Sequence, residues 1–389
     1  MNTYDVIFEV LRCGLFGGSL SDSTKKSFED EYFCKVVFKF ARSHDVAHLL
    51  YYCLQKGGVT LPEGEVAQRY QNEQFKALFR VEQLNYEVEQ ICATLEDAGV
   101  DFILLKGSVL RKSYPEEWMR TSCDVDVLIK EADSERARAA LEGKINYVFI
   151  DKYEYDLVFT APSGNNLELH FALVEDNPIT KEAANILNNV WEYTVPLDGY
   201  NHGFKMNSVM YYFFHIYHLA KHIKKGGGCG IKPFLDMMYI DDKADNDAEI
   251  RALLEKGGLL KVALLSEELV KVWFIGEAHS EASANISEFV LNGGVYGNME
   301  NRIVTTRSLG KSKLRYFIVR IFMPYSEMKN RYPELETKKW LFVPYQFRRW
   351  FDLLREGKAR SSFKELKTNN DLSAEDVERV ARMWRELGI

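Results

Sequence analysis

The chain has 389 residues, of which 46% are hydrophobic, 28% charged and 13% aromatic. This length supports a large core and more than one folding unit, and the aromatic content argues against long disordered stretches. The net charge of −7 provides no broad basic surface for duplex nucleic acid, so no duplex partner is expected.

The cysteine pattern and the apolar runs bear on the compartment. The six cysteines are scattered and form no Cys-x-x-Cys pair, which is typical of reduced thiols rather than of disulfides or a zinc ribbon. Acidic residues come early and no long apolar core follows them, so the sequence predicts no signal peptide. No apolar run reaches the roughly 18 residues that span a bilayer. We therefore expect a cytoplasmic protein without a membrane partner.

Residues 1–98 are predicted to form an N-terminal helical region. Apolar side chains recur at spacings of three and four, the pattern of one helix face, over residues 28–41, 46–54 and 65–98. Gly99 follows the third segment and is expected to end that helix. His44 and His48 lie four residues apart, and we interpret them as polar residues at a helix start rather than as a metal pair.

Residues 99–200 are predicted to form an α+β core. Short β-like runs cover residues 102–105, 123–129, 146–150, 155–160 and 167–173, and helices fit residues 108–113 and 131–141. The turn Pro162–Asn166 separates the last two strands, as a hairpin requires. A mixed, mostly antiparallel sheet is expected.

Residues 201–389 are predicted to form a C-terminal helical region. The helical pattern of residues 206–272 is interrupted at Lys225-Gly226-Gly227-Gly228, and Pro233 suits the first turn of the next helix. The last helix is expected at residues 373–387, with Ser373 as its N-cap. The predicted fold class is therefore α+β, with a mixed sheet between two helical regions.

Two carboxylates interrupt the apolar strand 123–129, namely Asp124 and Asp126. Residues i and i+2 of a strand point to the same face, so both carboxylates project together, about 6–7 Å apart along the backbone. Ionised carboxylates this close repel each other, and a divalent cation removes that penalty. Hard Mg²⁺ prefers oxygen ligands of this kind, so the pair predicts a site for Mg²⁺ or Mn²⁺.

A later strand, Leu167–Leu173, offers a third acid. Its apolar residues alternate, which places Glu168 and His170 together on the opposite face. Glu168 is the candidate third carboxylate, either as a metal ligand or as general base for an attacking hydroxyl. His170 is expected to orient Glu168 or to contact the substrate.

The triplet Lys106-Gly107-Ser108 lies between a strand and a helix, where backbone N–H groups favour an anion. Gly107 allows a phosphate to approach the backbone closely, Ser108 supplies a hydroxyl and Lys106 a positive charge. Arg120 is expected to add a bidentate phosphate contact. Together with the carboxylates, these groups are what nucleotidyl transfer requires, because metal ions bridge the phosphate oxygens while pyrophosphate leaves.

In this order of turn, Asp-x-Asp strand and later acidic strand, the chain resembles the nucleotidyltransferase-fold superfamily. More specifically, it is similar to bacterial nucleotidyltransferase family proteins of uncharacterised substrate. The matching residues are Leu105-Lys106-Gly107, Tyr114-Pro115, Arg120 with Asp124 and Asp126, Glu168-Leu169-His170, and the helical block His218–His222, followed by a glycine run, a basic residue and Asp236. The similarity covers most of residues 30–360.

The resemblance implies that Gly107, Ser108, Asp124, Asp126 and Glu168 are nucleotide and metal ligands. The superfamily most often uses Asp as its third acid, whereas this chain has Glu168. Asp156, on another predicted strand, is the alternative. We prefer Glu168 because of its strand register and its neighbour His170.

Three histidines of the C-terminal region, His215, His218 and His222, share a helix face by their spacing. Three interpretations remain open: a zinc site at His218 and His222, packing against the sheet domain, or, with Lys232 and Asp236, the far wall of a substrate cleft. A metalloprotease motif does not fit, because Leu219 follows His218 where that motif has Glu.

We therefore predict a metal-dependent nucleotidyltransferase with Mg²⁺ or Mn²⁺ as cofactor. It would bind ATP or another NTP and move the nucleoside monophosphate to a hydroxyl or phosphate of a small-molecule or macromolecular acceptor, releasing pyrophosphate. One alternative is a catalytically silent nucleotide-binding or interaction protein, and another is a zinc hydrolase using His218 and His222. The sequence does not specify the acceptor, the base or the oligomeric state.

Overall fold

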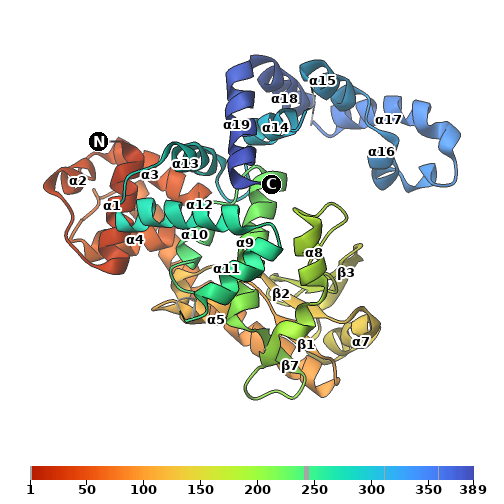
Figure 1. Ribbon diagram of the computed structural model, residues 1–389, viewed down its shortest axis with the longest axis horizontal. Coiled ribbons are helices and arrows are strands. Elements are labelled where there is room, and N and C mark those ends of the chain that lie inside the picture. The colour runs from red at the N-terminus through yellow and green to blue at the C-terminus, as the bar shows by residue number, and fades with distance from the viewer. Residues whose placement is uncertain (1, 241–244, 311, 358) are drawn as a thin grey trace.

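The computed structural model describes residues 2–240, 245–310, 312–357 and 359–389 (Figure 1). Five helices precede the sheet: α1 (Thr3–Phe16), α2 (Asp22–Ser27), α3 (Glu31–Ser43), α4 (Ala47–Lys56) and α5 (Glu65–Asp97). The three helices predicted from apolar spacing are confirmed. α5 ends just before Gly99, whose φ of +62° suits a glycine after a helix C-terminus.

His44, at the end of α3, and His48, in the first turn of α4, serve the packing of this region. His44 donates from Nε2 to the carbonyl of Leu291 at 3.0 Å, and His48 donates from Nε2 to the carbonyl of Met119 at 3.2 Å. Burial lowers the pKa of each imidazole to about 4. The two side chains therefore bond different segments instead of sharing a metal, as expected, but the helix-start interpretation is wrong for His44, which is the C-cap of α3, and neither side chain caps α4.

Buried His48 makes the stability depend on pH. Its pKa is about 4 in the folded chain against 6.5 ordinarily, because burial outweighs the opposing charge of Asp45. Only the unfolded chain takes up this proton between those values, so stability falls as the pH falls through the window. We expect His48→Gln, whose amide can still donate to Met119, to remove about 2 kcal/mol of the loss between about pH 7 and about pH 5. Urea unfolding of both proteins at the two pH values measures this, and parallel pH profiles would contradict it.

In the described part of the chain, seven strands form one mixed sheet in the order β3-β4-β5-β2-β1-β7-β6. They are β1 (Phe102–Leu104), β2 (Asp124–Ile129), β3 (Val148–Lys152), β4 (Asp156–Thr160), β5 (Asn166–His170), β6 (Thr194–Pro196) and β7 (Gly203–Met206). β2 is parallel to β5 and β1 to β7, and the other neighbouring pairs are antiparallel. This confirms the predicted mixed, mostly antiparallel sheet and its first five strands, whereas β6 and β7 were not predicted.

Alternation along β2 gives the sheet two different faces. Val125, Val127 and Ile129 pack into a core that includes side chains of α5 and of α7 (Ser134–Ile145). Asp124 and Asp126 therefore project to the other face, toward a cavity shared with α9 (Ser208–Lys221) and α10 (Lys232–Asp236). The sheet thus presents its carboxylates to the C-terminal helices.

The helices before and after the sheet share one hydrophobic core, which joins side chains of α1, α3 and α4 to those of α9 and the helices that follow. The remaining helices are α6 (Gly107–Leu110), α8 (Lys181–Asn188), α11 (Asp247–Lys256), α12 (Leu260–Val270), α13 (Glu281–Gly293), α14 (Met299–Ser308), α15 (Lys313–Ile321), α16 (Tyr325–Arg331), α17 (Phe342–Arg355), α18 (Ala359–Asp371) and α19 (Ala374–Leu387). Ser373 caps α19 in a reciprocal pair with Asp376, which confirms the predicted N-cap. Among the described residues, no helix is long and apolar enough to cross a bilayer.

Candidate active site

The candidate site is built on two parallel strands, β2 and β5. The strand register places Asp126 directly opposite Glu168. His170 follows two residues later on the same face of β5 and lies opposite Asp156 of β4. Neighbouring strands thus bring Asp126 and Glu168 together, although these two acids lie 42 residues apart along the chain.

Asp126 is the centre of this group and is only 3% exposed. Its Oδ1 accepts from Lys106 Nζ at 2.6 Å and from His170 Nε2 at 2.9 Å. Burial opposes ionisation of Asp126, but Lys106 and His170 outweigh it and hold the pKa of this carboxyl below its ordinary value. Asp126 is therefore a buried, ionised carboxylate at neutral pH.

The charge of Asp126 makes ionisation of the neighbouring carboxyl groups less favourable. Burial and the negative charge of Asp126 raise the pKa of both Asp124 and Glu168. Ligand atoms of Asp126, Glu168 and His170 all lie within 4.8 Å of one another. Two carboxylate oxygens and an imidazole nitrogen are a donor set that suits a divalent cation, with carboxylates favouring Mg²⁺ and Mn²⁺. The residues present thus fit a metal ion, and His170, expected only to orient or contact, belongs to the donor set.

The turn before α6 places Lys106 over this cluster. Lys106 adopts a left-handed backbone conformation with φ of +46°. Burial lowers the pKa of its ammonium, but Asp126 reverses the effect and raises it. A Cβ on Gly107 would lie 3.0 Å from Cβ of Ser122, so close packing favours glycine here. Ser108 is buried, and its hydroxyl has no hydrogen-bond partner among the described residues.

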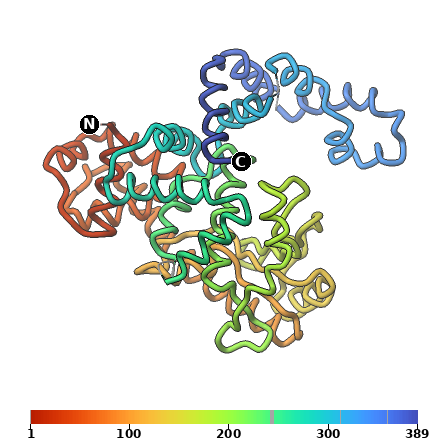
Figure 2. The backbone as a smooth tube through the Cα atoms, in the orientation of Figure 1, coloured from red at the N-terminus to blue at the C-terminus, as the bar shows by residue number. Residues whose placement is uncertain are grey.

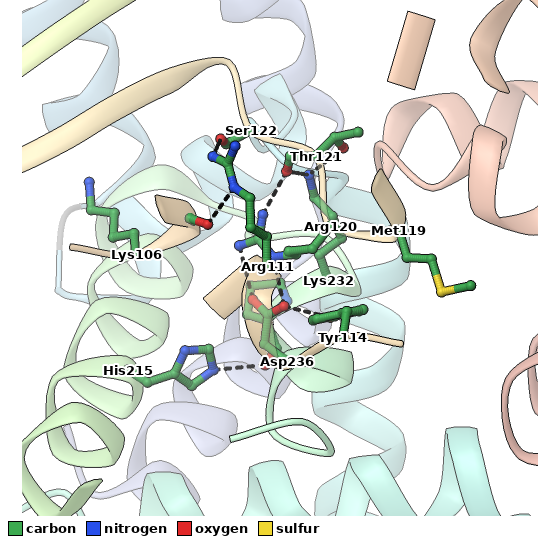
Figure 3. Close-up of polar contacts among 12 residues, drawn as sticks. Lys106, Arg111, Tyr114, Met119, Arg120, Thr121, Ser122, His215, Lys232 and Asp236 are labelled. Carbon is green, nitrogen blue, oxygen red and sulfur yellow. Dashed lines mark hydrogen bonds and ion pairs between the residues drawn. The ribbon is translucent and has the colours of Figure 1, made fainter. Parts of the chain in front are cut away.

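Arg120 is held by Asp236 of α10, as Figure 3 shows. Its Nε donates to Asp236 Oδ1 at 2.7 Å and its Nη2 to Oδ2 at 3.0 Å, while Nη1 donates to the carbonyl of Thr121 at 2.6 Å. Tyr114 donates its hydroxyl to the same Asp236 Oδ1 at 2.6 Å. The bidentate geometry that the sequence suggested for a phosphate is thus used on a carboxylate within the protein.

A cavity of about 350 Å³ joins these elements. From the sheet side it is lined by Lys106, Gly107, Arg120, Asp124 and Asp126, and from the helical side by His215, His218, His222, Lys232 and Asp236. The predicted far wall of His218, His222, Lys232 and Asp236 therefore faces the predicted metal and phosphate residues across one space. Glu168 and His170 are not among the residues that line this space: His170 contacts Asp126 at 2.9 Å, and Glu168 contacts His170 at 3.4 Å.

A family model described as an uncharacterised nucleotidyltransferase matches residues 34–275, more than half of the chain. The chain belongs to this uncharacterised nucleotidyltransferase family. No curated protein and no solved structure matches it. The matched residues contain the whole sheet, the acid cluster and the cavity wall formed by α9 and α10. The resemblance stated from the sequence is confirmed over residues 34–275, whereas its expected extension toward residue 360 is not matched. The α+β fold with helical flanks is confirmed as well.

In this nucleotidyltransferase, His215 and His218 of α9 and His222 directly after it bond within the protein. His218 and His222 face each other, with their Nε2 atoms 3.0 Å apart, and His215 Nε2 donates to the carbonyl of Pro233 at 2.8 Å. Burial and the charge of Lys106 lower the pKa of His222 to about 4, so it is neutral at neutral pH. Within the described ranges, the one group of three or more potential metal ligands is Asp126, Glu168 and His170. The zinc-hydrolase alternative therefore lacks a third ligand there.

Two site residues of this family member were missed by sequence reasoning. Asp45 accepts from Lys232 Nζ, which also donates to the carbonyl of Thr121 at 3.0 Å. Arg111 is fully buried and donates to the Gly107 carbonyl and to Ser122 Oγ, each at 2.9 Å. Arg111 thus fixes the glycine turn against β2. Nothing in the local pattern signals the burial of Arg111 or the distant partner of Asp45, because both partners come from other segments of the chain.

Proposed function

We propose that this nucleotidyltransferase moves a nucleoside monophosphate from an NTP to a hydroxyl or phosphate group of an acceptor and releases pyrophosphate. The observation that carries the proposal is the buried Asp126 with Glu168, His170 and Lys106 around it, at the floor of a cavity with a basic and polar wall. Asp124, Asp126 and Glu168, with His170, would hold Mg²⁺ or Mn²⁺. When bound, that ion would supply charge neutralisation of the phosphate oxygens.

The basic groups of the turn would hold the triphosphate. Lys106 lines the cavity and keeps its proton. Its ammonium can therefore donate a hydrogen bond to a phosphate oxygen instead of to Asp126. Gly107 lines the same wall, and Ser108 contributes the following backbone of the turn. Arg120 lines the same wall, but Asp236 balances its charge, so we assign Arg120 to holding α10 against the sheet domain rather than to binding the triphosphate.

Glu168 is proposed to take the proton of the acceptor hydroxyl. Burial and Asp126 raise its pKa, which makes the carboxylate a better base than an exposed one. The acceptor O–H bond breaks toward Glu168, its oxygen forms the new bond to the α-phosphorus, and the bond to pyrophosphate breaks. For a phosphate acceptor no proton needs to be removed, and Glu168 acts only as a ligand.

The structure offers a test of Glu168 against Asp156 as the third acid. Glu168 lies opposite Asp126, whereas Asp156 is 3.8 Å from His170 Nδ1, on the side of the imidazole away from Asp126. We expect Glu168→Gln to lower turnover with a hydroxyl acceptor by on the order of a hundredfold, and Asp156→Asn by less than about tenfold. Steady-state pyrophosphate release measures both, and the reverse ranking would make Asp156 the third acid.

Transfer itself is tested with purified protein, labelled NTPs, Mg²⁺ or Mn²⁺ and a cell extract as the source of acceptors. Pyrophosphate release together with label in an acceptor supports the proposal. Nucleotide binding with no turnover under any of these conditions would favour the silent nucleotide-binding alternative, which the large helical flanks suggest. Each NTP is assayed separately, so the same experiment reports the base preference.

A further inference from the structure

Residues 313–357, here called the C-terminal arm, differ in charge from the rest of the chain. They contain ten Lys and Arg residues and five Asp and Glu residues, a net charge of +5, whereas the whole chain carries −7. They also include eleven Phe, Tyr and Trp residues. The arm lies outside the segment that matches the nucleotidyltransferase family, which ends at residue 275.

Most of the arm stands apart from the shared core, which it meets through Tyr316 of α15. It comprises α15, α16 and α17, and Met328, Tyr332 and Leu335 form a small buried cluster of its own. In Figures 1 and 2, α16 and α17 project away from the sheet and from the N-terminal helices. Most of the arm's surface is therefore free to meet something outside the chain.

An apolar stripe runs along the exposed side of α17. Val343, Phe347, Phe351 and Leu354 follow one another at spacings of four, four and three residues, which places them on one helix face. Each is between 60% and 67% exposed. A stripe of this kind normally packs against a core, so the helix presents to solvent the face that would usually be buried.

The stripe continues onto α15. The ring of Trp350 contacts Phe347 on one side and Phe322 on the other, with centroid distances of 5.2 and 5.5 Å, and its Nε1 donates to the carbonyl of Ile321 at 2.9 Å. Exposed Leu314 and Ile318 lie on α15, one turn apart. The two helices thus share one extended apolar surface, in contrast to the single exposed apolar residues that are common on protein surfaces.

Basic side chains border this surface. Lys338 and Lys339 precede Trp340, which is 75% exposed, and Arg348 and Arg355 adjoin the stripe residues Phe347 and Leu354 in sequence. Among the described residues, Lys338 and Lys339 form no ion pair. Exposed aromatic residues next to Lys and Arg are the composition of helices that lie in the plane of an anionic membrane interface.

We propose that the C-terminal arm docks this enzyme onto an anionic lipid bilayer surface. The α17 stripe and Trp340 enter the boundary between headgroups and acyl chains, and the flanking Lys and Arg bind lipid phosphates. Charge favours this occupant over an arm-to-arm contact with a second copy of the chain, because two arms of net charge +5 repel each other, whereas an anionic surface attracts each arm. The remainder of the chain is acidic and is repelled by an anionic surface. Attraction confined to the arm therefore also fixes the orientation of the body. The attachment is peripheral and needs no spanning helix.

Co-sedimentation of the full chain with vesicles tests the proposal. We expect binding to vesicles of equal parts phosphatidylcholine and phosphatidylglycerol, little binding to phosphatidylcholine alone, and weaker binding at high salt. The double variants Phe347→Ser with Phe351→Ser, and Lys338→Glu with Lys339→Glu, should each weaken partitioning by about tenfold or more. Matched controls on the opposite end of the chain are Phe75→Ser with Phe79→Ser, a similarly exposed aromatic pair on α5, and Lys25→Glu with Lys26→Glu on α2.

The arm is supported as the docking surface if both control variants bind anionic vesicles as well as wild type does and both arm variants bind them more weakly. Equal binding to neutral and anionic vesicles, no binding to either, or equal losses in the controls would overturn it. A dimer that dissociates in the Phe347 and Phe351 variant, with no vesicle binding by wild type, would instead assign the stripe to a second copy of the chain. Circular dichroism of each variant confirms that the helices are retained.

Discussion

Replacement of Asp126 by Asn is expected to cause the largest loss of activity of any single change in the site. The amide keeps the shape of the side chain but removes the negative charge that Lys106 and His170 contact. Under the proposed function, the divalent cation would lose a buried ionised ligand. Pyrophosphate release should fall by on the order of a hundred- to a thousandfold.

A matched acid separates this effect from a general change in charge. Asp151 is an exposed acid on β3 of the same sheet, so Asp151→Asn should leave the rate unchanged. Thermal unfolding of both variants shows whether the fold is retained. A folded Asp126→Asn protein with turnover close to that of Asp151→Asn would contradict the assignment of Asp126.

The second large effect is expected in stability, at Asp236. This carboxylate is 1% exposed and pairs with both nitrogens of the Arg120 fork. Removing one member of a buried pair leaves the other charge uncompensated, so Asp236→Ala should lower the free energy of unfolding by about 3–5 kcal/mol. Urea denaturation at neutral pH measures the change.

An exposed pair provides the comparison. Glu65 and Arg69 form an ion pair one turn apart on α5, with more than half of each side chain exposed. Glu65→Ala should therefore cost about 0.5 kcal/mol or less. Combining Asp236→Leu with Arg120→Met should recover part of the stability, because no buried charge is then left unpaired. Equal losses for Asp236→Ala and Glu65→Ala would show that the buried pair is not a special feature of the fold.

The parts of the fold visible in the sequence are those with a strong periodic signal. The apolar spacing of α5 and the two-residue alternation of β2 and β5 predict their burial directly. β6 and β7 have only three and four residues, too few for alternation to show, and β7 is positioned by its parallel pairing with β1. Their existence follows from tertiary pairing and not from local pattern.

The residues of the site also divide into those that the sequence predicts and those that it does not. Asp124, Asp126 and Glu168 are visible because carboxylates are unusual in apolar strands. Long-range partners are not visible: Arg120 is 116 residues from Asp236, and Lys232 is 187 residues from Asp45. The sequence therefore suggested that Arg120 binds a phosphate, whereas the structure pairs it with the buried carboxylate of Asp236.

The measurement that tests the central claim most directly is the affinity of the protein for magnesium–ATP, by titration calorimetry. The account predicts that wild type binds, that binding requires the metal, and that Asp124→Asn with Asp126→Asn weakens it by about a hundredfold or more, equivalent to about 3 kcal/mol. The Asp151→Asn protein should bind like wild type. Unchanged affinity in a folded Asp124→Asn, Asp126→Asn double variant would contradict the claim that this cluster binds the metal–nucleotide.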